Sequence, residues 1–376
     1  MKRVCIITTV HSPLDTRIFY REAISLAKKY KVVIVAPSEK DFEEQGIKFI
    51  GLGTINSRLQ RFGKSILAFR YSLKTKADVY HFHDPELIFV GLALRLVTQK
   101  IVIYDIHENN PEFILDKEWI PTPILRKIIS LAVNLIENLA AVFFSGVIVV
   151  NERLQSRFEK YNKHTLVIRN FPSLEFGREF SKVDFAKRRR IAVYIGGIEK
   201  DRGILEILSF VKKFPNYYLK FLFIGLVKGS RLREEIDSFI SKENISKDKF
   251  EIVPQVSHKD IPVYLNDSFV GLIPFLKTRN NFLGIPQKTF EYMAYGLPIV
   301  ASDFLYLGKY IRDSKSGILI KNQDNMDEYK RALDQLNDSN LWTELSRSSR
   351  RAFEKKYNWE KEEKKLLDFY AKLLPE

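Results

Sequence analysis

Ionisable side chains gather directly after three strand-like segments in the first half of the chain. They are His11, Asp15, Arg17, His81, His83, Asp84, Glu86, Asp105, His107 and Glu108. Because the carboxyl ends of parallel strands meet at one edge of a sheet, we expect these residues to surround one site. Such a set could bind a polar ligand or a metal ion, although strand-end loops are also commonly polar for structural reasons alone. The spacing in HFHD matches no closed zinc site, so we expect no metal.

A second group of residues, in the other half of the chain, has the features of an anion site. In YIGGIEKDRG, Gly196 and Gly197 would let the backbone approach a ligand closely, and Arg202 precedes the next helix. In GIPQKTFEYMAYGLPIVASD, Lys288 and Glu291 fall in the first turns of an apolar helix. A lysine is unfavourable at the positive end of a helix unless an anion binds there. The GxGxxG and GxxxxGK[ST] patterns are absent, which argues against a nicotinamide enzyme and a P-loop.

Strands and helices alternate along both halves and must position these groups. Short runs rich in Val and Ile, such as KVVIVAP and IAVYIGG, are typical of parallel strands buried on both faces. We therefore expect an α/β protein with two doubly wound, Rossmann-like parallel-sheet domains facing a cleft. The expected bounds are 1–175 for the first domain, 176–190 for a linker and 191–376 for the second domain. The terminal helix either stays with the second domain or packs back on the first.

Composition narrows the class of protein. The chain has 376 residues with a net charge of +15, and most of this excess lies in the first half, which suggests an anionic partner. A single cysteine, Cys5, excludes a disulfide framework and favours the cytoplasm. The N-terminal apolar run is too short for a signal peptide. The most apolar stretch, 124–150, is interrupted by Arg126, Lys127 and Glu137, so we expect a buried helix and a strand there instead of a membrane span.

Several motifs together resemble one known family. GIPQKTFEYMAYGLPIVAS resembles the PxKxxEYMAxGxPVVAS signature of the GT-B-fold glycosyltransferases of family four, which are retaining enzymes that use nucleotide sugars. YIGGIEKDRGILEIL resembles the strand, turn and helix that open their second domain. TTVHSPLDTRIFYREAISLAKKY, YDIHENNPE and VIRNFPS also match in place. The resemblance runs from Val4 to Tyr370, and the signature around Glu291 is its most specific part.

The resemblance implies a hexosyltransferase that moves a hexose-type sugar from a UDP- or GDP-linked donor with retention of configuration. Arg202 and Lys288 would hold the donor diphosphate, and His107 would lie against the transferred sugar; we take these three as the catalytic residues. Glu291 would accept hydrogen bonds from the ribose hydroxyls. The remaining donor-binding positions are Gly196, Gly197, Gly284, Ile285 and Pro286. No cofactor and no metal are expected, since the chain has no DxD motif.

The sequence departs from the family pattern at two positions. Leu283 stands where the family usually has a glutamate that touches the sugar hydroxyls, and Gly197 stands where an arginine is common. The second departure leaves neutralisation of the phosphates to Arg202 and Lys288. Both departures occur together in a branch of polysaccharide type, so we expect an active enzyme of cell-surface polysaccharide or glycoconjugate assembly.

The acceptor side is expected in the first domain. Its candidate residues are His11, Asp15, Arg17, His83, Asp84 and Glu108. The acceptor would be a glycan or a sugar carried on a polyprenyl diphosphate. Residues 58–76 form a basic helix that is either a solvated outer helix of the sheet or a contact with anionic lipid. We therefore expect a cytoplasmic protein, with peripheral attachment to the inner face of the cell membrane as a hypothesis.

The residues also suggest three alternatives to a glycosyltransferase. Leu283 favours a non-catalytic scaffold that binds nucleotide sugars, and the architecture is also shared by GT-B-fold sugar-nucleotide epimerases. The net charge would suit a nucleic-acid binder, but no aromatic-rich basic platform supports this class, so we expect no nucleic-acid partner.

Overall fold

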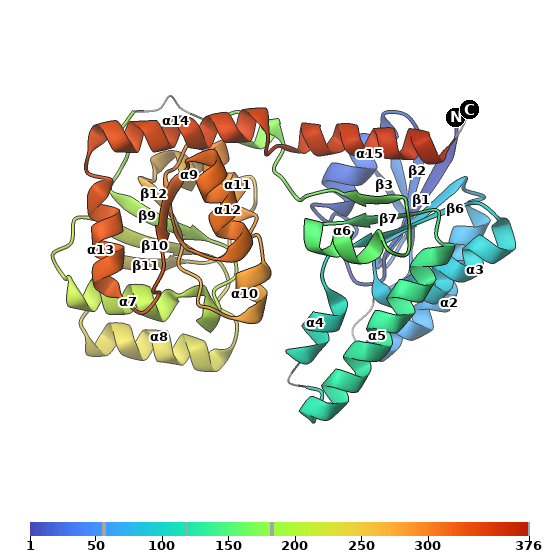
Figure 1. Cartoon of the computed structure of the whole chain (residues 1–376), viewed down its shortest axis with the longest axis horizontal. Helices are drawn as coiled ribbons and strands as arrows, with labels where there is room; N and C mark the ends of the chain where they lie inside the picture. The colour runs from blue at the N-terminus through green and yellow to red at the C-terminus, as the bar shows by residue number, and fades with distance from the viewer. Residues whose placement is uncertain (55–57, 118, 181–183, 375–376) are drawn as a thin grey trace. The chain divides into compact units, whose positions relative to one another are not determined.

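The computed structural model describes residues 1–54, 58–117, 119–180 and 184–374. It divides the chain into two compact units, each with its own sheet (Figure 1). The first unit comprises Met1–Asn170 together with Trp359–Glu376, and the second comprises Phe171–Asn358. Each unit is a doubly wound α/β domain, as expected from the alternation of strands and helices.

The first unit contains an eight-stranded sheet with the order β3-β4-β2-β1-β5-β6-β7-β8. Its strands are β1 (Arg3–Ile7), β2 (Lys31–Ala36), β3 (Phe42–Glu44), β4 (Ile47–Gly51), β5 (Val79–Phe82), β6 (Ile101–Ile106), β7 (Gly146–Val149) and β8 (Thr165–Val167). All neighbouring pairs are parallel except β3 with β4, which places one short antiparallel strand at the edge.

Both faces of this sheet are buried. The helical segments are η1 (Ile18–Ala23), α1 (Ile24–Ala27), α2 (Arg58–Lys74), η2 (Pro85–Leu87), α3 (Ile88–Thr98), α4 (Asn110–Leu115), α5 (Pro123–Phe143), α6 (Glu152–Phe158) and α15 (Trp359–Leu373). Along β1, Val4 and Ile6 belong to one core cluster whereas Cys5 and Ile7 belong to the other. This alternation follows from the two-residue period of a strand, so an apolar run without polar alternation fills two cores at once.

The C-terminal helix α15 is part of the first unit. Of the two expected arrangements, it therefore adopts the one in which it packs back on the first domain. The indole N–H of Trp359 donates to Ser25 Oγ at 2.9 Å, and the Tyr370 hydroxyl lies 2.8 Å from His81 Nδ1. Trp359, Leu366, Phe369 and Tyr370 are buried in one of the two cores of the unit. The first unit is therefore built from two separate segments of the chain.

The second unit contains a six-stranded, wholly parallel sheet with the order β11-β10-β9-β12-β13-β14. Its strands are β9 (Ile191–Ile195), β10 (Lys220–Ile224), β11 (Phe250–Val253), β12 (Val270–Ile273), β13 (Ile299–Ser302) and β14 (Gly317–Ile320). Its helical segments are η3 (Leu174–Gly177), η4 (Lys200–Arg202), α7 (Ile204–Lys213), α8 (Ser230–Lys242), α9 (Ile261–Asp267), α10 (Arg279–Leu283), α11 (Lys288–Ala294), α12 (Leu305–Ser314), α13 (Met326–Gln335) and α14 (Ser339–Lys355).

The described residues of the expected linker, 176–180 and 184–190, are packed into the second unit. The Arg188 guanidinium donates to the carbonyls of Leu265 and Tyr295 at 2.7 and 3.0 Å. The Tyr295 hydroxyl donates to the Phe176 carbonyl at 2.6 Å. Mixed charge and a proline suggested an interdomain linker, but Arg188 of this segment satisfies carbonyl groups at the ends of two helices of the second unit.

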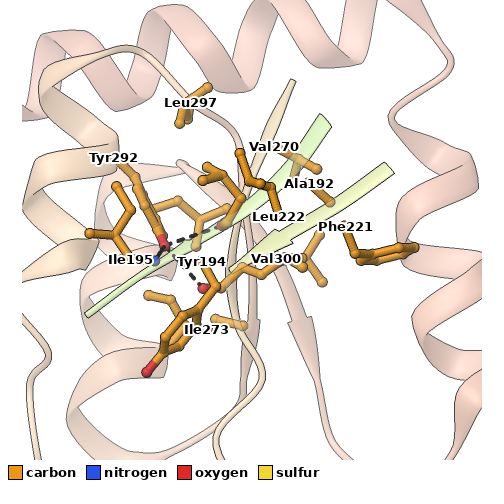
Figure 2. Close-up of a cluster of buried hydrophobic side chains, with 14 of the residues drawn as sticks. Ala192, Tyr194, Ile195, Phe221, Leu222, Val270, Ile273, Tyr292, Leu297 and Val300 are labelled. Carbon is orange, nitrogen blue, oxygen red and sulfur yellow. Dashed lines mark hydrogen bonds between the residues drawn. The ribbon is translucent and has the colours of Figure 1, made fainter. Parts of the chain in front are cut away.

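A tyrosine holds the centre of the second sheet together (Figure 2). The Tyr292 hydroxyl accepts the N–H of Ile195 at 3.1 Å and lies 3.2 and 3.3 Å from the carbonyl oxygens of Val193 and Leu272. The strands β9 and β12 pair only at Val270 with Ala192 and at Gly271 with Val193. Tyr292, on α11, therefore bonds to both strands near the place where their pairing ends, and this fixes the helix against the carboxyl end of β9.

The helix α5 differs from the expectation of a buried helix. Its start agrees with the sequence, because the Thr122 side chain accepts the N–H of Leu125 and Pro123 occupies the first turn. Many of its large apolar side chains are nevertheless exposed, among them Ile124 and Leu131 at 72% and 68%. None of the described helices combines the length and the apolar character needed to cross a membrane.

Candidate functional site

The strand order of each sheet reverses beside its first strand. In the first unit β1 lies between β2 and β5, and in the second unit β9 lies between β10 and β12. Ligands of doubly wound sheets bind in the crevice outside the carboxyl ends of the strands at such a reversal. In the first unit, the residues singled out in the sequence follow β1, β5 and β6, except His81 and Asp105, which lie near the carboxyl ends of β5 and β6. In the second unit, the glycine loop and Arg202 follow β9, and Lys288 and Glu291 lie on α11, which Tyr292 holds against the end of β9.

In the second unit, the glycine loop after β9 lies against Lys288. Gly196 has a φ of +120°, a conformation that favours glycine, and a Cβ added there would lie 3.4 Å from Lys288 Nζ. Lys288 is the first residue of α11, which Tyr292 fixes to the end of β9. The loop, the lysine and the start of α11 are therefore neighbours, as the sequence motifs suggested.

The environment of Lys288 is unusual for a lysine. Its side chain is buried, and Nζ lies 3.4 Å from the centre of the Tyr194 ring and 5.0 Å from that of Phe275. Within the described parts of the chain, no carboxylate oxygen lies within 4.0 Å of this nitrogen. Burial, together with the charge of Arg202, lowers the pKa of Lys288 well below its ordinary value. An anion bound here would offset both effects, so the site favours a negatively charged ligand.

Arg202 is held next to this lysine by a residue that the sequence reasoning missed. Its Nη1 donates to the Asn281 side-chain oxygen at 2.8 Å, and its guanidinium lies over the Phe275 ring, 4.4 Å from the centre. The Asn281 amide donates to the Asp201 carbonyl at 3.0 Å, and Thr278 caps α10. Asn281 thus sets the direction of the guanidinium. Its position within a short polar helix gave no signal in the sequence.

Glu291 has a neighbour that was also missed. Its Oε1 lies 3.5 Å from Nε2 of His258, whose ring lies 4.8 Å from that of Phe176. His258 follows β11, so strand-end position was the available signal, as it was for the other histidines.

The remaining donor-side positions form the connection between α10 and α11. Leu283 ends α10, and Gly284, Ile285 and Pro286 lead to α11. These three residues are partly exposed. The N–H of Gly284, expected to hold phosphate, is directed at the Asn281 carbonyl at 3.4 Å. Because this contact is long, a ligand would have to compete with only a weak hydrogen bond for that N–H.

In the first unit, Asp84 organises the loop after β1. Its Oδ2 accepts hydrogen bonds from the Thr8 hydroxyl at 2.8 Å and from the N–H groups of Thr9 and Val10 at 2.5 and 3.2 Å. Its other oxygen lies 3.5 Å from Nε2 of His11. These contacts show a structural role for Asp84, which was expected on the acceptor side.

His11, Asp15 and Glu108 stay accessible at this edge of the sheet. Burial opposes protonation of His11, but Asp15 and Asp84 outweigh it, so the pKa of His11 is raised. The same contact lowers the pKa of Asp15 to about 2, against the effect of burial. Glu108 is exposed. A positive and a negative group at one rim can bind the hydroxyl groups of a polar ligand.

Arg17 does not lie at the rim. Its guanidinium is buried and forms a bidentate pair with Asp105, with Nη2 to Oδ1 at 3.0 Å and Nε to Oδ2 at 3.2 Å. It also donates to the Asn170 side chain at 2.8 Å and lies 2.9 Å from Glu22 Oε1. These internal partners occupy Arg17, so the structure does not present it to an acceptor.

A chain of rings connects this buried network to the edge of the sheet. His83 Nδ1 lies 3.0 Å from His107 Nε2, and the ring of His107 lies 4.9 Å from that of His11. Burial lowers the pKa of His107 to about 3 and that of His83 well below its ordinary value. Both rings are therefore neutral near pH 7, and His107 can take part in uncharged hydrogen bonds at the rim.

Four buried residues of this network could in principle hold a metal ion. One atom each of Glu22, His81, His83 and Asp105 lies within 4.8 Å of the others. The Arg17 guanidinium, however, is 2.9 Å from both carboxylates and already places a positive charge there. Burial and the Asp105 charge raise the pKa of Glu22 well above its ordinary value, so a proton can balance its charge. The network fits an arginine and a proton better than a divalent ion.

Comparison with known proteins gives a family match for part of the chain and a fold for nearly all of it. Residues 175–358 match the family model described as glycosyl transferases group 1. Spore coat protein SA of Bacillus subtilis is 25% identical over 191 residues, which cover 49% of this chain and 49% of that protein. The chain thus spans about half the length of the curated relatives it matches.

Solved structures extend the similarity over nearly the whole chain. Sucrose-phosphate synthase from Thermosynechococcus elongatus has a TM-score of 0.75 at 17% identity and covers 99% of both chains. The Anabaena protein Alr3699/HepE, solved in complex with UDP, has a TM-score of 0.71 at 14% identity and covers 99% of this chain and 100% of its own. The chain therefore has the GT-B fold of two Rossmann-like domains, and its second unit matches the glycosyl transferases group 1 family in sequence.

Proposed function

We propose that the protein is a retaining glycosyltransferase that moves a hexose-type sugar from a UDP- or GDP-linked donor to a glycan or lipid-linked acceptor. The observation that supports this most is the buried Lys288, which lies against a glycine loop and two aromatic rings without a carboxylate within 4.0 Å among the described residues. The family match of residues 175–358 and the UDP and UDP-glucose complexes of the fold relative Alr3699/HepE support the same function.

The donor diphosphate would bind between Lys288 and Arg202. Cleavage of the bond between the sugar C1 and the phosphate oxygen increases negative charge on the leaving diphosphate, and fixed cations stabilise that charge most in the transition state. Since Asn281 and Phe275 orient Arg202 beforehand, little reorganisation is needed when the charge develops. Glu291 would bind the ribose hydroxyls, with His258 holding its carboxylate in place.

We assign the transferred sugar and the acceptor to residues of the first unit. His107, held by His83 and neutral near pH 7, would contact the transferred sugar through an uncharged hydrogen bond. His11, Asp15 and Glu108 would bind the acceptor. Retention would follow from attack on the same face of the sugar, with the departing phosphate taking the acceptor proton. The pathway we propose is cell-surface polysaccharide or glycoconjugate assembly.

One residue favours a second candidate function. Leu283, at the end of α10, stands where the family that the sequence resembles usually has an acid for the sugar hydroxyls, and its side chain offers no hydrogen bond. A scaffold that binds nucleotide sugars without transferring them would have the same anion site. A panel of UDP and GDP sugars, assayed for transfer and hydrolysis with the anomer followed by NMR, separates the two. Binding without any turnover across the panel would favour the scaffold.

The anion site itself is tested by thermal unfolding with UDP and GDP, each with and without EDTA. A ligand that binds only the folded protein raises its melting temperature. We expect at least one nucleoside diphosphate to stabilise the wild type equally with and without EDTA, and to lose this effect in Lys288→Ala. The matched control is Lys242→Ala, which removes an exposed lysine at the end of α8. Equal shifts in wild type and Lys288→Ala would remove Lys288 from the site, and a shift abolished by EDTA would contradict metal-free binding.

A further inference from the structure

The helix α5 carries its apolar side chains on the wrong side for an ordinary outer helix. The residues directed into the unit are small or polar, namely Ser130, Glu137, Ala140 and Ala141. The exposed side chains are large and apolar, and they are Ile124, Leu125, Ile128, Leu131, Leu135, Ile136, Leu139, Val142 and Phe143. A surface helix of a protein in water normally shows the reverse pattern. We call this row the α5 face.

More apolar side chains are exposed close to α5. The neighbouring helix α3 exposes Phe89, Leu96 and Val97, and it packs against α5 within the first unit (Figure 1). Trp119, shortly before α5, is also exposed. So many large apolar side chains exposed on two packed helices indicate an interaction site, since single-chain proteins in water rarely expose large apolar patches.

The charges that α2, α3 and α5 expose have one sign, whereas α4, which also packs against α5, carries Glu112, paired with Arg153, and is followed by the exposed Asp116. Among the residues of α2, α3 and α5, Glu137 is the only acid, and it is fully buried. Its carboxylate accepts hydrogen bonds from Tyr104, Asn110 and Arg157. The helix α2, which packs against α3, exposes Arg70 and Lys74, and α5 itself exposes Lys127. These three helices therefore offer cations and apolar side chains to a partner, without an exposed acid.

Exposed apolar side chains next to cations favour one kind of partner over another. A second copy of the chain, docked through the same face, would bring the cations of α2 and α5 from both copies together, and α2, α3 and α5 expose no acid to pair with them. An anionic bilayer supplies both complements, with acyl chains for the aliphatic row and lipid phosphates for the cations. Trp119 adds a side chain that favours the boundary between lipid and water.

We propose that the α5 face docks on the surface of an anionic phospholipid bilayer, with α5 lying parallel to that surface and its aliphatic row among the acyl chains. The cations of α2 and α5 contact the lipid phosphates. The basic segment 58–76 thus plays a secondary role in membrane binding, and the attachment depends mainly on α5. Docking does not require sugar transfer, so its test is independent of the function proposed above.

Vesicle flotation of the full-length protein tests this proposal. The vesicles contain either phosphatidylcholine alone or phosphatidylcholine with about a third phosphatidylglycerol, at low and high salt. We expect the wild type to float with the anionic vesicles and to bind more weakly at high salt, because screening removes the electrostatic part. Trp119 provides a second signal, since Trp342 and Trp359 are buried and a blue shift on binding would report Trp119 entering the interface.

The matched variants change exposed residues, so the fold should survive. Leu131→Gln with Leu135→Gln removes two side chains of the α5 face, and we expect vesicle binding to fall by at least about tenfold. Leu226→Gln with Val263→Gln removes two exposed apolar side chains of the second unit and should bind as the wild type does. Circular dichroism and the nucleotide-induced thermal shift should be unchanged in both.

Three results would overturn the proposal. They are failure of the wild type to float, equal flotation of the α5-face variant, and a wild-type dimer in light scattering that the α5-face variant dissociates without any vesicle binding. The last result would assign the α5 face to a second copy of the chain. Loss of the nucleotide shift with flotation intact would instead count against the proposed function alone.

Discussion

The two crevices are built on the same strand arrangement but differ in how their charges are balanced. In the first unit, Arg17 lies 2.9 Å from both Asp105 and Glu22, all of them buried; Asp105 supplies the counter-charge, since the pKa of Glu22 is raised and a proton balances its charge. In the second, Lys288 is buried against the rings of Tyr194 and Phe275. The charges of the first network balance one another without a ligand. In the second, a bound anion would stabilise the buried charge of Lys288. The comparison indicates that the first arrangement supports the fold, whereas the second is suited to an anionic ligand.

The largest effect expected is on stability, from breaking the buried pair in the first unit. Asp105→Asn removes the counter-charge that Asp105 supplies to Arg17, and removing one partner of such a pair costs about 3–5 kcal/mol. Urea unfolding of the full chain measures this loss. Asp78→Asn, which alters the partly exposed pair with Lys100, should cost no more than about 1 kcal/mol. Similar losses in both variants would contradict the self-contained character of the first network.

Loss of the lysine in the second unit should leave stability intact and reduce activity. Lys288→Ala removes a fixed cation at the diphosphate, and we expect kcat/KM for the donor to fall roughly 100- to 1000-fold. Removing a buried cation without a carboxylate partner should not lower the free energy of unfolding of the apo protein. Steady-state kinetics and urea unfolding on the same preparation separate the two quantities. A variant that is both active and destabilised would reverse the assignment of the two crevices.

A smaller effect is expected at the residue that positions Arg202. Asn281→Ala removes the acceptor of the guanidinium, so Arg202 becomes less ordered but keeps its charge. Losing one hydrogen bond to a charged group costs about 1.5–3 kcal/mol, which corresponds to a rise of roughly tenfold or more in the KM for the donor. The KM for the acceptor should stay constant. A change confined to the acceptor KM would place Asn281 outside the donor site.

The smallest effect concerns pH. Because the pKa of His107 in the folded protein is about 3, below its ordinary value of 6.5, its contribution to stability is complete above pH 6.5 and is lost as pH falls toward 3. The wild type should therefore lose about 1 kcal/mol more than His107→Gln between pH 6.5 and 5.5. Urea unfolding at the two pH values checks this, and parallel profiles would show that His107 titrates normally.

The sequence predicted most of what local pattern determines. Short Val- and Ile-rich runs identified parallel strands buried on both faces, because burial of a strand shows in its own residues. The position of Lys288 at a helix start predicted an anion site, and its burial beside Arg202 agrees with that prediction. The alternation of strands and helices also placed the polar groups at the correct edge of each sheet.

Features that depend on distant residues were not predictable from local pattern. Asp105 lies far along the chain from Arg17, so nothing near position 17 showed that the arginine would be buried. Asn281 belonged to no motif that marked it, and for His258 the only local signal was its place after a strand. For α5, the apolar spacing gave a helix but could not tell which face the sheet would cover, and the small residues Ser130, Ala140 and Ala141 proved to be the inner ones.

The return of α15 to the first unit has a consequence for biosynthesis. A ribosome delivers residues 1–170 long before Trp359 and Tyr370 emerge, so the nascent first unit lacks a helix that later fills one of its cores. The second unit is continuous in sequence and can mature on its own. Completion of the first unit therefore has to wait until α15 has been synthesised, and chains truncated before 359 should depend on chaperones or be degraded.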